Sequence, residues 1–377
     1  MNLLDLPTEV LAMIAGALQN AKDINSLART SRALYSCINY VLYKSDVQNE
    51  SGKALIWAAR RNKPATARMS LQAGVKTLKQ WHRTPLVFAL KRGHEAMMRL
   101  LLDEGVDPDE ILFEGSRMET TALYMAASSG YDAIVKLLID KGASVNLKKA
   151  PGHPLVIAAS NNRKTVVRLL LENGADPNAT RRYDNTTALN IAVMRGNSEI
   201  VSMLLHKGAH TEMGDDHGTT PLHAAIKKNH CKITQLLLEG GADVGARDSS
   251  GCTPLDSAMT YGSQRSLSLF LKHVELNAQN CWRLHTAITM NKTAAVRLLL
   301  AHGADINRKD SEGQTPLLYA MLQGYDHLVE LLLLYDVDPD AERHDGLSPL
   351  KLANEINRED WAQKLREKRD ERKSSRS

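Results

Sequence analysis

The sequence predicts an all-α solenoid of about ten helix-turn-helix repeats, preceded by a short helical segment of a different kind. A start signal such as "TPLHAAIKKN" recurs along the chain with a period of about 33 residues, which is typical of stacked helical repeats. Every copy has Gly or Asn nine residues after its start. Aromatic residues make up only 5% of the 377 residues, which suits small stacked helices better than one large core.

The first element, residues 3–43, lacks the start signal and begins with "LLDLPTEVLAMIAGALQ". Pro7 suits a first helical turn, and Val10, Ile14 and Leu18 fall on one helical face. A second helix is expected after Asp23. A segment of about 40 residues rarely folds alone. The apolar faces of these helices should therefore pack on the first repeat, on a partner, or on both.

The repeat array is expected over residues 51–366. Thr or Ser at the helix N-cap satisfies free backbone amides, and Pro is tolerated at the first helical position. A second helix follows, as in "TVVRLLLENGAD", and ends at a second glycine in most copies. The copies start near residues 53, 84, 121, 153, 187, 220, 253, 282, 315 and 348.

The residue nine positions after each start is expected to end the first helix in the left-handed conformation. Gly and Asn enter that conformation more readily than other residues. These positions are Asn62, Gly93, Gly130, Asn162, Gly196, Asn229, Gly262, Asn291, Gly324 and Asn357.

Several copies depart from the pattern. The second copy is longer and carries the loop "DPDEILFEGSRMET", whereas the seventh is shorter, and Val274 replaces its glycine. A local irregularity in stacking is expected there. In the last copy Trp361 and Leu365 form one apolar stripe, as expected of a terminal cap, which has one face exposed to solvent. Residues 367–377 form a basic tail that is expected to be disordered.

These patterns resemble the ankyrin repeat. Copies six to nine carry the succession TPLH, LLL, GAD and DxxG, and Thr220 to Ala225 matches best. The resemblance covers more than four-fifths of the chain. It implies antiparallel helix pairs in a curved stack whose first helices and turns form a concave face, where partners of this family dock.

The first element resembles an F-box. The resemblance is carried by Leu6, Pro7, Glu9, Val10, Ile14 and Leu27, with the segment from Arg32 to Tyr35. The Trp often found near the end of that family's motif is absent, and Tyr43 stands nearby. The resemblance implies binding to the Skp-type adaptor of a cullin-based ubiquitin ligase, in an order of domains similar to that of fungal F-box/ankyrin proteins. The alternative is that this helix pair only caps the array.

The chain lacks the signals of other protein classes. No apolar stretch of about 18 residues is present, so no membrane span is expected, and Asp5 and Glu9 disfavour a signal peptide. Four cysteines lie far apart, so reduced thiols and a cytoplasmic or nuclear location are expected.

No catalytic pattern is recognisable in the sequence. It has no phosphate-binding glycine loop, no HExxH and no GxSxG. Cys281 and His285 have the spacing of half a zinc site, but no second pair lies nearby. We expect packing roles for His223 and His285, turn-forming roles for the GAD and DxxG aspartates, and neither an enzyme nor a cofactor.

Charge is unevenly distributed. Residues 51–94 contain ten Lys and Arg and no acidic residue, whereas residues 95–140 contain ten acidic residues and three basic ones. Neighbouring repeats with complementary solvated surfaces would explain this. A binding surface is the competing explanation, because basic residues recur just before the first-helix stops in the first half and uncharged ones from Thr260 to Gln323.

The predicted partner surface therefore has a cationic end to attract an acidic segment and an apolar end to anchor it. Nucleic acid is disfavoured, because few aromatic residues alternate with the charges. We expect a monomer that captures a protein without chemistry, either as a ubiquitin-ligase substrate receptor or as a scaffold or transcriptional coregulator. The predicted surface residues are Arg60, Arg61, Trp81, Arg83, Lys91, Arg92, Tyr183, Arg195, Lys227, Lys228, Tyr261 and Met290.

Overall fold

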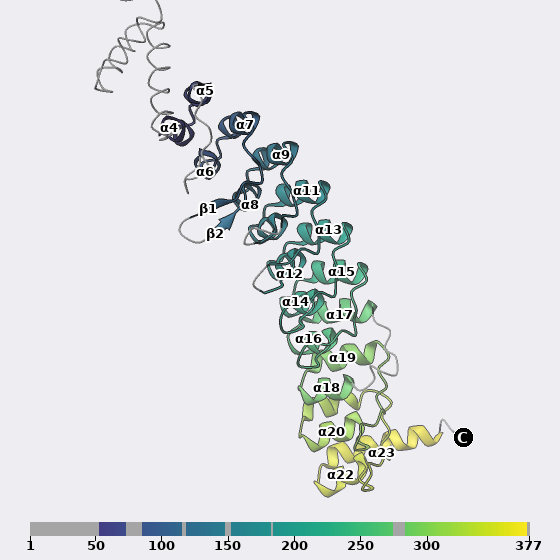
Figure 1. Ribbon diagram of the computed structural model, residues 1–377. Helices are drawn as coiled ribbons and strands as arrows, with labels where there is room; N and C mark the ends of the chain where they lie inside the picture. Colours follow the sequence, from purple (N-terminus) through teal and green to yellow (C-terminus); the bar gives the residue numbers. More distant parts are fainter. Residues whose placement is uncertain are drawn as a thin grey trace, which may run out of the picture. The chain divides into compact units, whose positions relative to one another are not determined.

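The computed structural model describes residues 53–72, 85–114, 118–147, 152–181, 184–273 and 283–374 (Figure 1). These ranges hold twenty helices and one two-stranded hairpin. The predicted F-box positions Leu6, Pro7, Glu9, Val10, Ile14 and Leu27 lie outside them, as do Trp81, Arg83, Tyr183 and the connection around Val274. None of the described helices combines the length and apolar character needed to cross a membrane.

The chain divides into two compact units, residues 1–188 and 189–377. In each unit the even-numbered helices are the first helices of the repeats, and the odd-numbered helices are the second. Unit 1 contains α4 (Lys53–Arg61), α5 (Pro64–Gln72), α6 (Pro85–Lys91), α7 (Glu95–Asp103), α8 (Ala122–Ser129), α9 (Asp132–Asp140), α10 (Pro154–Ser160) and α11 (Lys164–Glu172).

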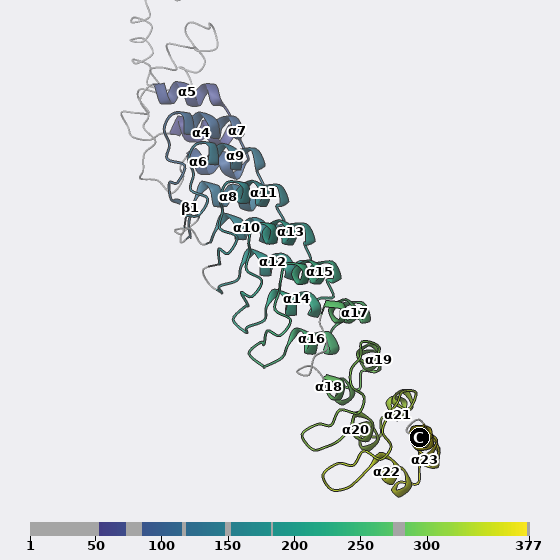
Figure 2. The ribbon, with the colours of Figure 1, turned by 90° about the vertical axis from the view of Figure 1, so that its right-hand side faces the viewer.

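Unit 2 continues the same alternation, beginning within α12. Within each unit, first helices pack on first helices and second helices on second helices (Figure 2). The helices are α12 (Ala188–Met194), α13 (Ser198–His206), α14 (Pro221–Lys227), α15 (Cys231–Glu239), α16 (Pro254–Thr260), α17 (Gln264–His273), α18 (Arg283–Thr289), α19 (Thr293–Ala301), α20 (Pro316–Leu322), α21 (Asp326–Leu332), α22 (Pro349–Glu355) and α23 (Glu359–Ser374).

The helix starts follow the predicted chemistry. Thr315 caps α20 by accepting a hydrogen bond from the Leu318 amide at 3.3 Å, with Pro316 at the first helical position. Ser348 does the same for α22. After their first residues, the helices bury small and aliphatic side chains, such as Ala258 in α16 and Leu284 in α18. Capping and apolar spacing are both local properties of the sequence, which is why the repeat starts could be read from it.

The helix stops follow the prediction at nine of the ten positions, where Gly or Asn has a positive φ. Gly262 is the exception, and the prediction was wrong there. Its amide bonds the Ala258 carbonyl at 3.0 Å and its backbone is not left-handed. The next amide, that of Ser263, bonds the Asn229 side-chain oxygen of the preceding repeat at 2.6 Å. A contact from the neighbouring repeat thus replaces the usual local turn.

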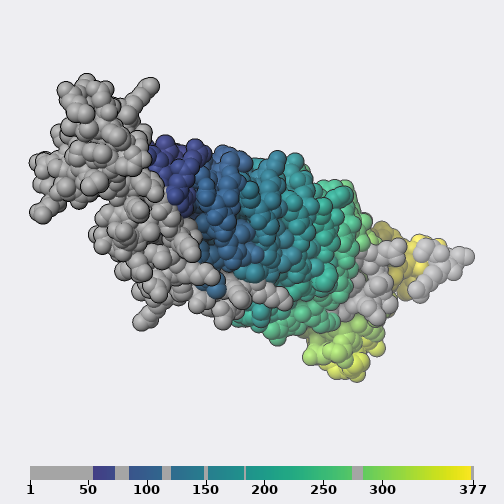
Figure 3. Space-filling view, turned by 45° about the horizontal axis from the view of Figure 1, so that its top comes forward, coloured from purple at the N-terminus to yellow at the C-terminus, as the bar shows by residue number. Residues whose placement is uncertain are grey.

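Adjacent repeats give a second reason for glycine at some stops. A Cβ at Gly93 would lie 3.0 Å from the Tyr131 ring of the following repeat. In unit 2, a Cβ at Gly196 would lie 2.9 Å from the His230 ring. Successive repeats therefore meet closely at these turns, and the space-filling view shows them as consecutive bands within each unit (Figure 3).

The longer second copy contains a short hairpin that the sequence did not predict. Strands β1 (Leu112–Glu114) and β2 (Met118–Thr120) pair antiparallel, with Leu112 opposite Thr120. Leu112 and Thr120 are both buried. The all-α solenoid is confirmed, and this hairpin is a local addition in the inserted loop.

The last helix, α23, extends further than expected. Trp361 and Leu365 are buried, as predicted for the terminal cap. Beyond them the helix continues to Ser374, so residues 367–374 are helical, and the expected disorder was wrong for this part of the tail. Ion pairs explain the extension, because Arg369 reaches Asp340 at 2.8 Å and Arg372 reaches Asp336 at 3.0 Å.

Candidate partner-binding surface

In unit 1 the predicted basic residues lie where first helices end. Arg60 and Arg61 occupy the last turn of α4, and Lys91 and Arg92 lie at the end of α6. All four are exposed. The Arg60 guanidinium stacks over the Phe88 ring at 4.1 Å, which fixes its position. Cations at helix C-termini are favoured by the helix dipole, so this placement is electrostatically stable.

The acidic residues between positions 95 and 140 of unit 1 lie mainly outside the first helices. Glu95 pairs with Arg99 along α7 at 3.1 Å, and Asp103 pairs with Lys141 at 2.6 Å. Among the residues that the structure describes, no carboxylate is within ion-pair distance of Arg61 or Arg92. The opposite charges are therefore partly separated between first and second helices and do not simply neutralise each other.

In unit 2 the basic residues Arg195, Lys227 and Lys228 are exposed at the ends of α12 and α14. The Lys227 ammonium lies 3.9 Å from the Asp248 carboxylate and 6.0 Å from the centre of the Tyr261 ring. Lys227 thus connects the end of its own helix with the turn and the first helix of the next repeat.

Apolar side chains continue this row. Tyr261 is 60% exposed, Met290 36%, Leu322 38% and Ile356 44%, which are high values for large apolar residues. They lie at the ends of α16, α18, α20 and α22. The Thr260 hydroxyl, one residue before Tyr261, lies 3.4 Å from the Met290 sulfur, so the ends of α16 and α18 are in contact. We call Arg195, Lys227, Lys228, Tyr261, Met290, Leu322 and Ile356 the end strip.

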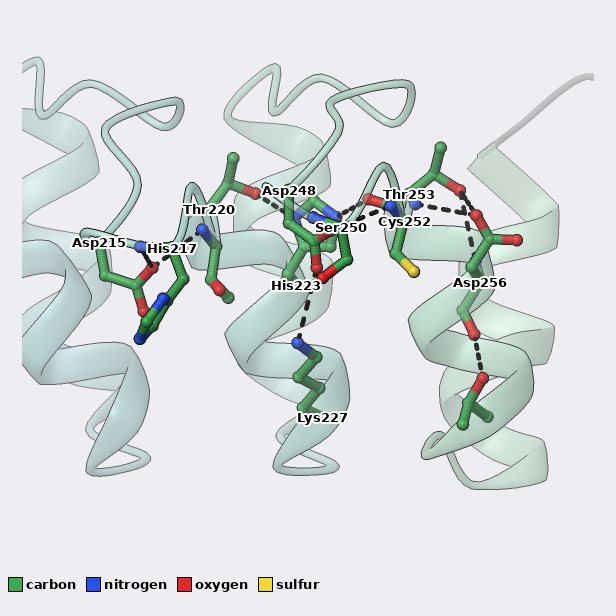
Figure 4. Close-up of polar contacts among 12 residues, drawn as sticks. Asp215, His217, Thr220, His223, Lys227, Asp248, Ser250, Cys252, Thr253 and Asp256 are labelled. Carbon is green, nitrogen blue, oxygen red and sulfur yellow. Dashed lines mark hydrogen bonds and ion pairs between the residues drawn. The ribbon is translucent and has the colours of Figure 1, made fainter.

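A buried histidine holds the first helix of the sixth repeat against the next turn (Figure 4). The His223 ring nitrogens lie 2.9 Å from the Thr220 hydroxyl and 3.0 Å from the Cys252 carbonyl oxygen. Burial lowers the pKa of His223 from its ordinary value of 6.5, so the ring is neutral near pH 7. Nε2 therefore donates to Cys252, and the Thr220 hydroxyl donates to Nδ1.

The turns that border the end strip are built around aspartates. Asp248 accepts hydrogen bonds from the Ser250 and Cys252 amides at 2.9 and 3.0 Å, and Asp215 accepts in the same way one repeat earlier (Figure 4). The Ser249 amide also donates to the His217 carbonyl at 2.9 Å, which joins the two turns. These aspartates have the turn-forming role that the sequence predicted.

The seventh and eighth repeats are joined differently. Asp256 stands where the sixth repeat has His223, and Arg283 stands where six of the other nine repeats have Pro. The two side chains form a buried ion pair, with 11% and 3% of their side-chain surfaces exposed. Asp256 also accepts from the Thr253 amide and hydroxyl at 2.9 and 2.8 Å. This pair was not predicted from the sequence. An Asp at the histidine position of one copy and an Arg at the proline position of the next copy were the signal that could have revealed it.

The remaining candidates for chemistry have structural roles. His285 lies 2.9 Å from the Gln314 carbonyl oxygen, which confirms its packing role. Cys231 and Cys252 are free thiols. Among the described residues, no group of three or more His, Cys, Asp or Glu side chains is placed to hold a metal ion.

The repeat geometry agrees with a family comparison. The family model of ankyrin repeats matches in overlapping segments that run from residues 27–111 to residues 284–375. The chain belongs to the ankyrin repeat family. The F-box-like family model matches residues 3–48, so an F-box-like segment precedes the ankyrin array. Both families are protein-interaction modules without catalytic machinery, and the chain is a protein-interaction module of this composite kind.

The similarity to individual ankyrin proteins is partial. The chain is 30% identical to the nuclear factor NF-kappa-B p105 subunit of Gallus gallus over 176 residues, which is 44% of this chain and 14% of that protein. It is 38% identical to protein phosphatase 1 regulatory subunit 27 of Homo sapiens over 69 residues, or 18% of this chain and 45% of that protein. The chain thus spans less than half the length of both relatives.

Solved structures show the same fold. The crystal structure of the ankyrin repeat domain of Bcl-3, a member of the IkappaB protein family, matches with a TM-score of 0.50 at 24% identity. The match covers 57% of this chain and 96% of that chain. At this identity the likeness establishes the ankyrin fold alone.

Proposed function

We propose that this protein is the substrate-recognition subunit of a Skp-cullin-F-box type ubiquitin ligase. The observation that carries the proposal is the succession of an F-box-like segment at residues 3–48 and an ankyrin array. The first part would bind the Skp-type adaptor, and the array would hold the protein to be modified. The chain would contribute proximity, while the other subunits would supply the chemistry.

The end strip is the proposed capture surface in unit 2. Its exposed cations suit a partner with an acidic segment, and its exposed apolar side chains offer the desolvated contacts that dominate binding energy. In unit 1, Arg60, Arg61, Lys91 and Arg92 form a second cationic surface that is suited to acidic segments. The predicted surface residues that the structure describes are all exposed, as this role requires.

Adaptor binding is tested by co-purification of the full chain with a purified Skp-type adaptor. The variant Leu6→Asp/Pro7→Ala should lose the adaptor, because it introduces a charge into the apolar motif. The variant Lys227→Glu/Lys228→Glu serves as the matched control and should retain the adaptor, because it changes only the array surface. Circular dichroism establishes that both variants keep the helical array.

The result separates two functions. If the folded wild-type chain does not bind the adaptor at micromolar concentration, the receptor role is rejected. The alternative is then an ankyrin scaffold or transcriptional coregulator whose first helices only cap the array. If the adaptor binds and the Leu6→Asp/Pro7→Ala variant loses it, the scaffold alternative is rejected.

The cationic surface of unit 1 is tested separately. Reversal of Arg60, Arg61, Lys91 and Arg92 to Glu should weaken partner capture and reduce its dependence on salt, because counterion screening acts on exposed charges. The matched control is reversal of Arg99, which already pairs with Glu95 on α7. A captured partner whose affinity and salt dependence do not change in the fourfold variant does not bind this surface.

A further inference from the structure

An exposed tryptophan lies among the cations of unit 1. Trp57 on α4 is 49% exposed, which is a high value for a large apolar side chain. Arg60 and Arg61 follow it by three and four residues, so the three side chains share one side of the helix. This surface therefore presents an accessible aromatic ring next to positive charge.

The next repeat supplies a second aromatic ring at the same register. Phe88 lies four residues after the start of its copy, as Trp57 does, and α4 packs against α6 (Figure 2). The Arg60 guanidinium lies 4.1 Å from the centre of the Phe88 ring. A guanidinium that stacks through its face keeps its N–H donors at the edge, where they suit a bidentate contact with phosphate. We call Trp57, Arg60, Arg61, Phe88, Lys91 and Arg92 the aromatic-cationic patch.

The charge of this patch has a single sign. Residues 51–94 contain ten Lys and Arg and no acidic residue. The acidic residue that follows them, Glu95, pairs with Arg99 at 3.1 Å. Within the part of the chain that the structure describes, no carboxylate is in ion-pair distance of Arg61 or Arg92. The patch therefore favours a ligand that carries several negative charges.

The two features of the patch suit two parts of one ligand. Cations pair with the phosphates of a nucleic acid, and exposed aromatic rings stack on its bases. A duplex keeps its base faces stacked on one another, so only a single strand offers them to a side chain. An acidic protein segment would use the cations alone, in exposed ion pairs that contribute little, and would leave the Trp57 ring unmatched.

From the aromatic rings and the excess of cations together, we infer that the aromatic-cationic patch binds single-stranded nucleic acid. Phosphates meet its four cations, and a base stacks on Trp57. The sequence disfavours this ligand because few aromatic residues alternate with the charges along the chain, but the packing of α4 on α6 brings Trp57 and Phe88 to one surface. The inference goes beyond the proposed function, in which the F-box-like segment and the end strip bind proteins.

Synthetic strands test the ligand class. The probes are fluorescein-labelled oligothymidylate and oligouridylate of about 15 nucleotides, which spans the usual site size of single-strand surfaces. Fluorescence anisotropy with the full chain should show about tenfold tighter binding of at least one strand than of a polyglutamate peptide of the same length. The corresponding duplex should also bind more weakly than the strand. A duplex that binds as tightly overturns the inference, and so does polyglutamate, which would assign the patch to acidic protein segments.

Matched variants of the full chain locate the stacking site. Trp57→Ala should weaken strand binding about tenfold, as expected for the loss of one stacked base, and Trp57→Phe should retain most of the affinity. Tyr261→Ala is the control, because Tyr261 is 60% exposed and lies near a cation, Lys227, in unit 2. Equal losses in Trp57→Ala and Tyr261→Ala overturn the assignment of the site.

Salt dependence measures the phosphate contacts. If each of the four cations of the patch neutralises one phosphate, the logarithm of the association constant should fall against the logarithm of salt concentration with a slope of about −3. Arg61→Gln/Arg92→Gln should reduce the slope to about −1.5. Lys227→Gln/Lys228→Gln, at the ends of first helices in unit 2, is the matched control and should leave the slope unchanged. Equal slopes for the wild type and the arginine variant overturn the role of the patch.

The outcome is independent of the adaptor test. Leu6→Asp/Pro7→Ala leaves the patch unchanged and should bind the strand as the wild type does. If the adaptor binds but no strand is preferred, only the nucleic-acid inference fails. If a strand is preferred but the adaptor does not bind, the receptor function fails while the ligand class stands.

Discussion

Within unit 2, the sixth repeat is joined to the seventh by different chemistry from that which joins the seventh to the eighth. In the sixth repeat, a neutral His223 reaches the Cys252 carbonyl of the next turn. At the junction, Asp256 occupies the histidine position and pairs with Arg283 of the next repeat. One connection is a neutral hydrogen bond, and the other is a buried ion pair.

The difference shows that departures from a repeat pattern can compensate each other across a boundary. Asp256 alone would place an unpaired charge in a buried position, and so would Arg283. Together their opposite charges compensate each other, while Thr253 supplies further donors to Asp256. Neutral connections tolerate change better than charged ones, because breaking a buried ion pair leaves an uncompensated charge. The following four predictions test regular contacts between repeats against the exceptional ones, from the largest expected effect to the smallest.

Removal of one member of the ion pair should have the largest effect. Arg283→Leu should destabilise α16 and α18 by about 3–5 kcal/mol, because Asp256 stays buried without its partner. Amide hydrogen exchange of these two helices measures the loss. Adding Asp256→His, which restores the residue type of the sixth repeat, should recover much of it. Arg99→Leu, in an exposed ion pair, is the control, and an equal effect of Arg99→Leu and Arg283→Leu would contradict the contrast.

The two glycine stops should respond differently to asparagine. At Gly324, φ is 69° and an added Cβ would have open space around it, so Gly324→Asn should be nearly neutral. At Gly262, a Cβ would lie 2.5 Å from the Ala258 carbonyl oxygen, so Gly262→Asn should cost about 1–3 kcal/mol. Thermal denaturation midpoints of the two variants provide the measurement. Similar midpoints would show that Gly262 adopts the common stop.

Acidification should weaken the neutral connection. The folded-state pKa of His223 lies below its ordinary value of 6.5, so the unfolded chain binds a proton first as the pH falls. Stability from this group is complete above pH 6.5 and declines below it, by up to about 1.4 kcal/mol per pH unit until the ring protonates in the fold. Hydrogen exchange of α14 measures the decline, and His223→Gln should reduce it. An unchanged pH dependence in that variant would assign the decline to other groups.

The side chain of Asn229 should contribute more to stability than that of Asn291, the matching residue of the eighth repeat. Its side-chain oxygen accepts from the Ser263 amide at 2.6 Å and from the Ser266 hydroxyl at 3.2 Å. Asn229→Gly keeps the left-handed backbone but removes this acceptor, and should cost about 1 kcal/mol. Asn291→Gly, at the matching position of the eighth repeat, should be nearly neutral. Equal denaturation midpoints would show that the contact with the seventh repeat is unimportant.

Much of this fold could be predicted because its determinants are local. Thr315 and Pro316 start a helix through their own backbone chemistry, and Asn357 ends one because of its conformational freedom. The exposed positions of the end strip also followed from repeat register, since Lys228, Tyr261 and Met290 each lie eight residues after the start of their copy. Periodicity carries this information without any knowledge of tertiary contacts.

The sequence by itself determined the ankyrin repeats, their boundaries and the row of basic and apolar helix ends. Only the tertiary structure decided how the exceptions are accommodated. Asp256 finds Arg283 across a repeat boundary, Ser263 finds Asn229, and Arg372 holds the end of α23 to Asp336. Each of these contacts joins residues that are about one repeat apart, and the period specifies where such residues lie but not which side chains bond. That choice depends on three-dimensional packing and on the cost of leaving a polar group unsatisfied.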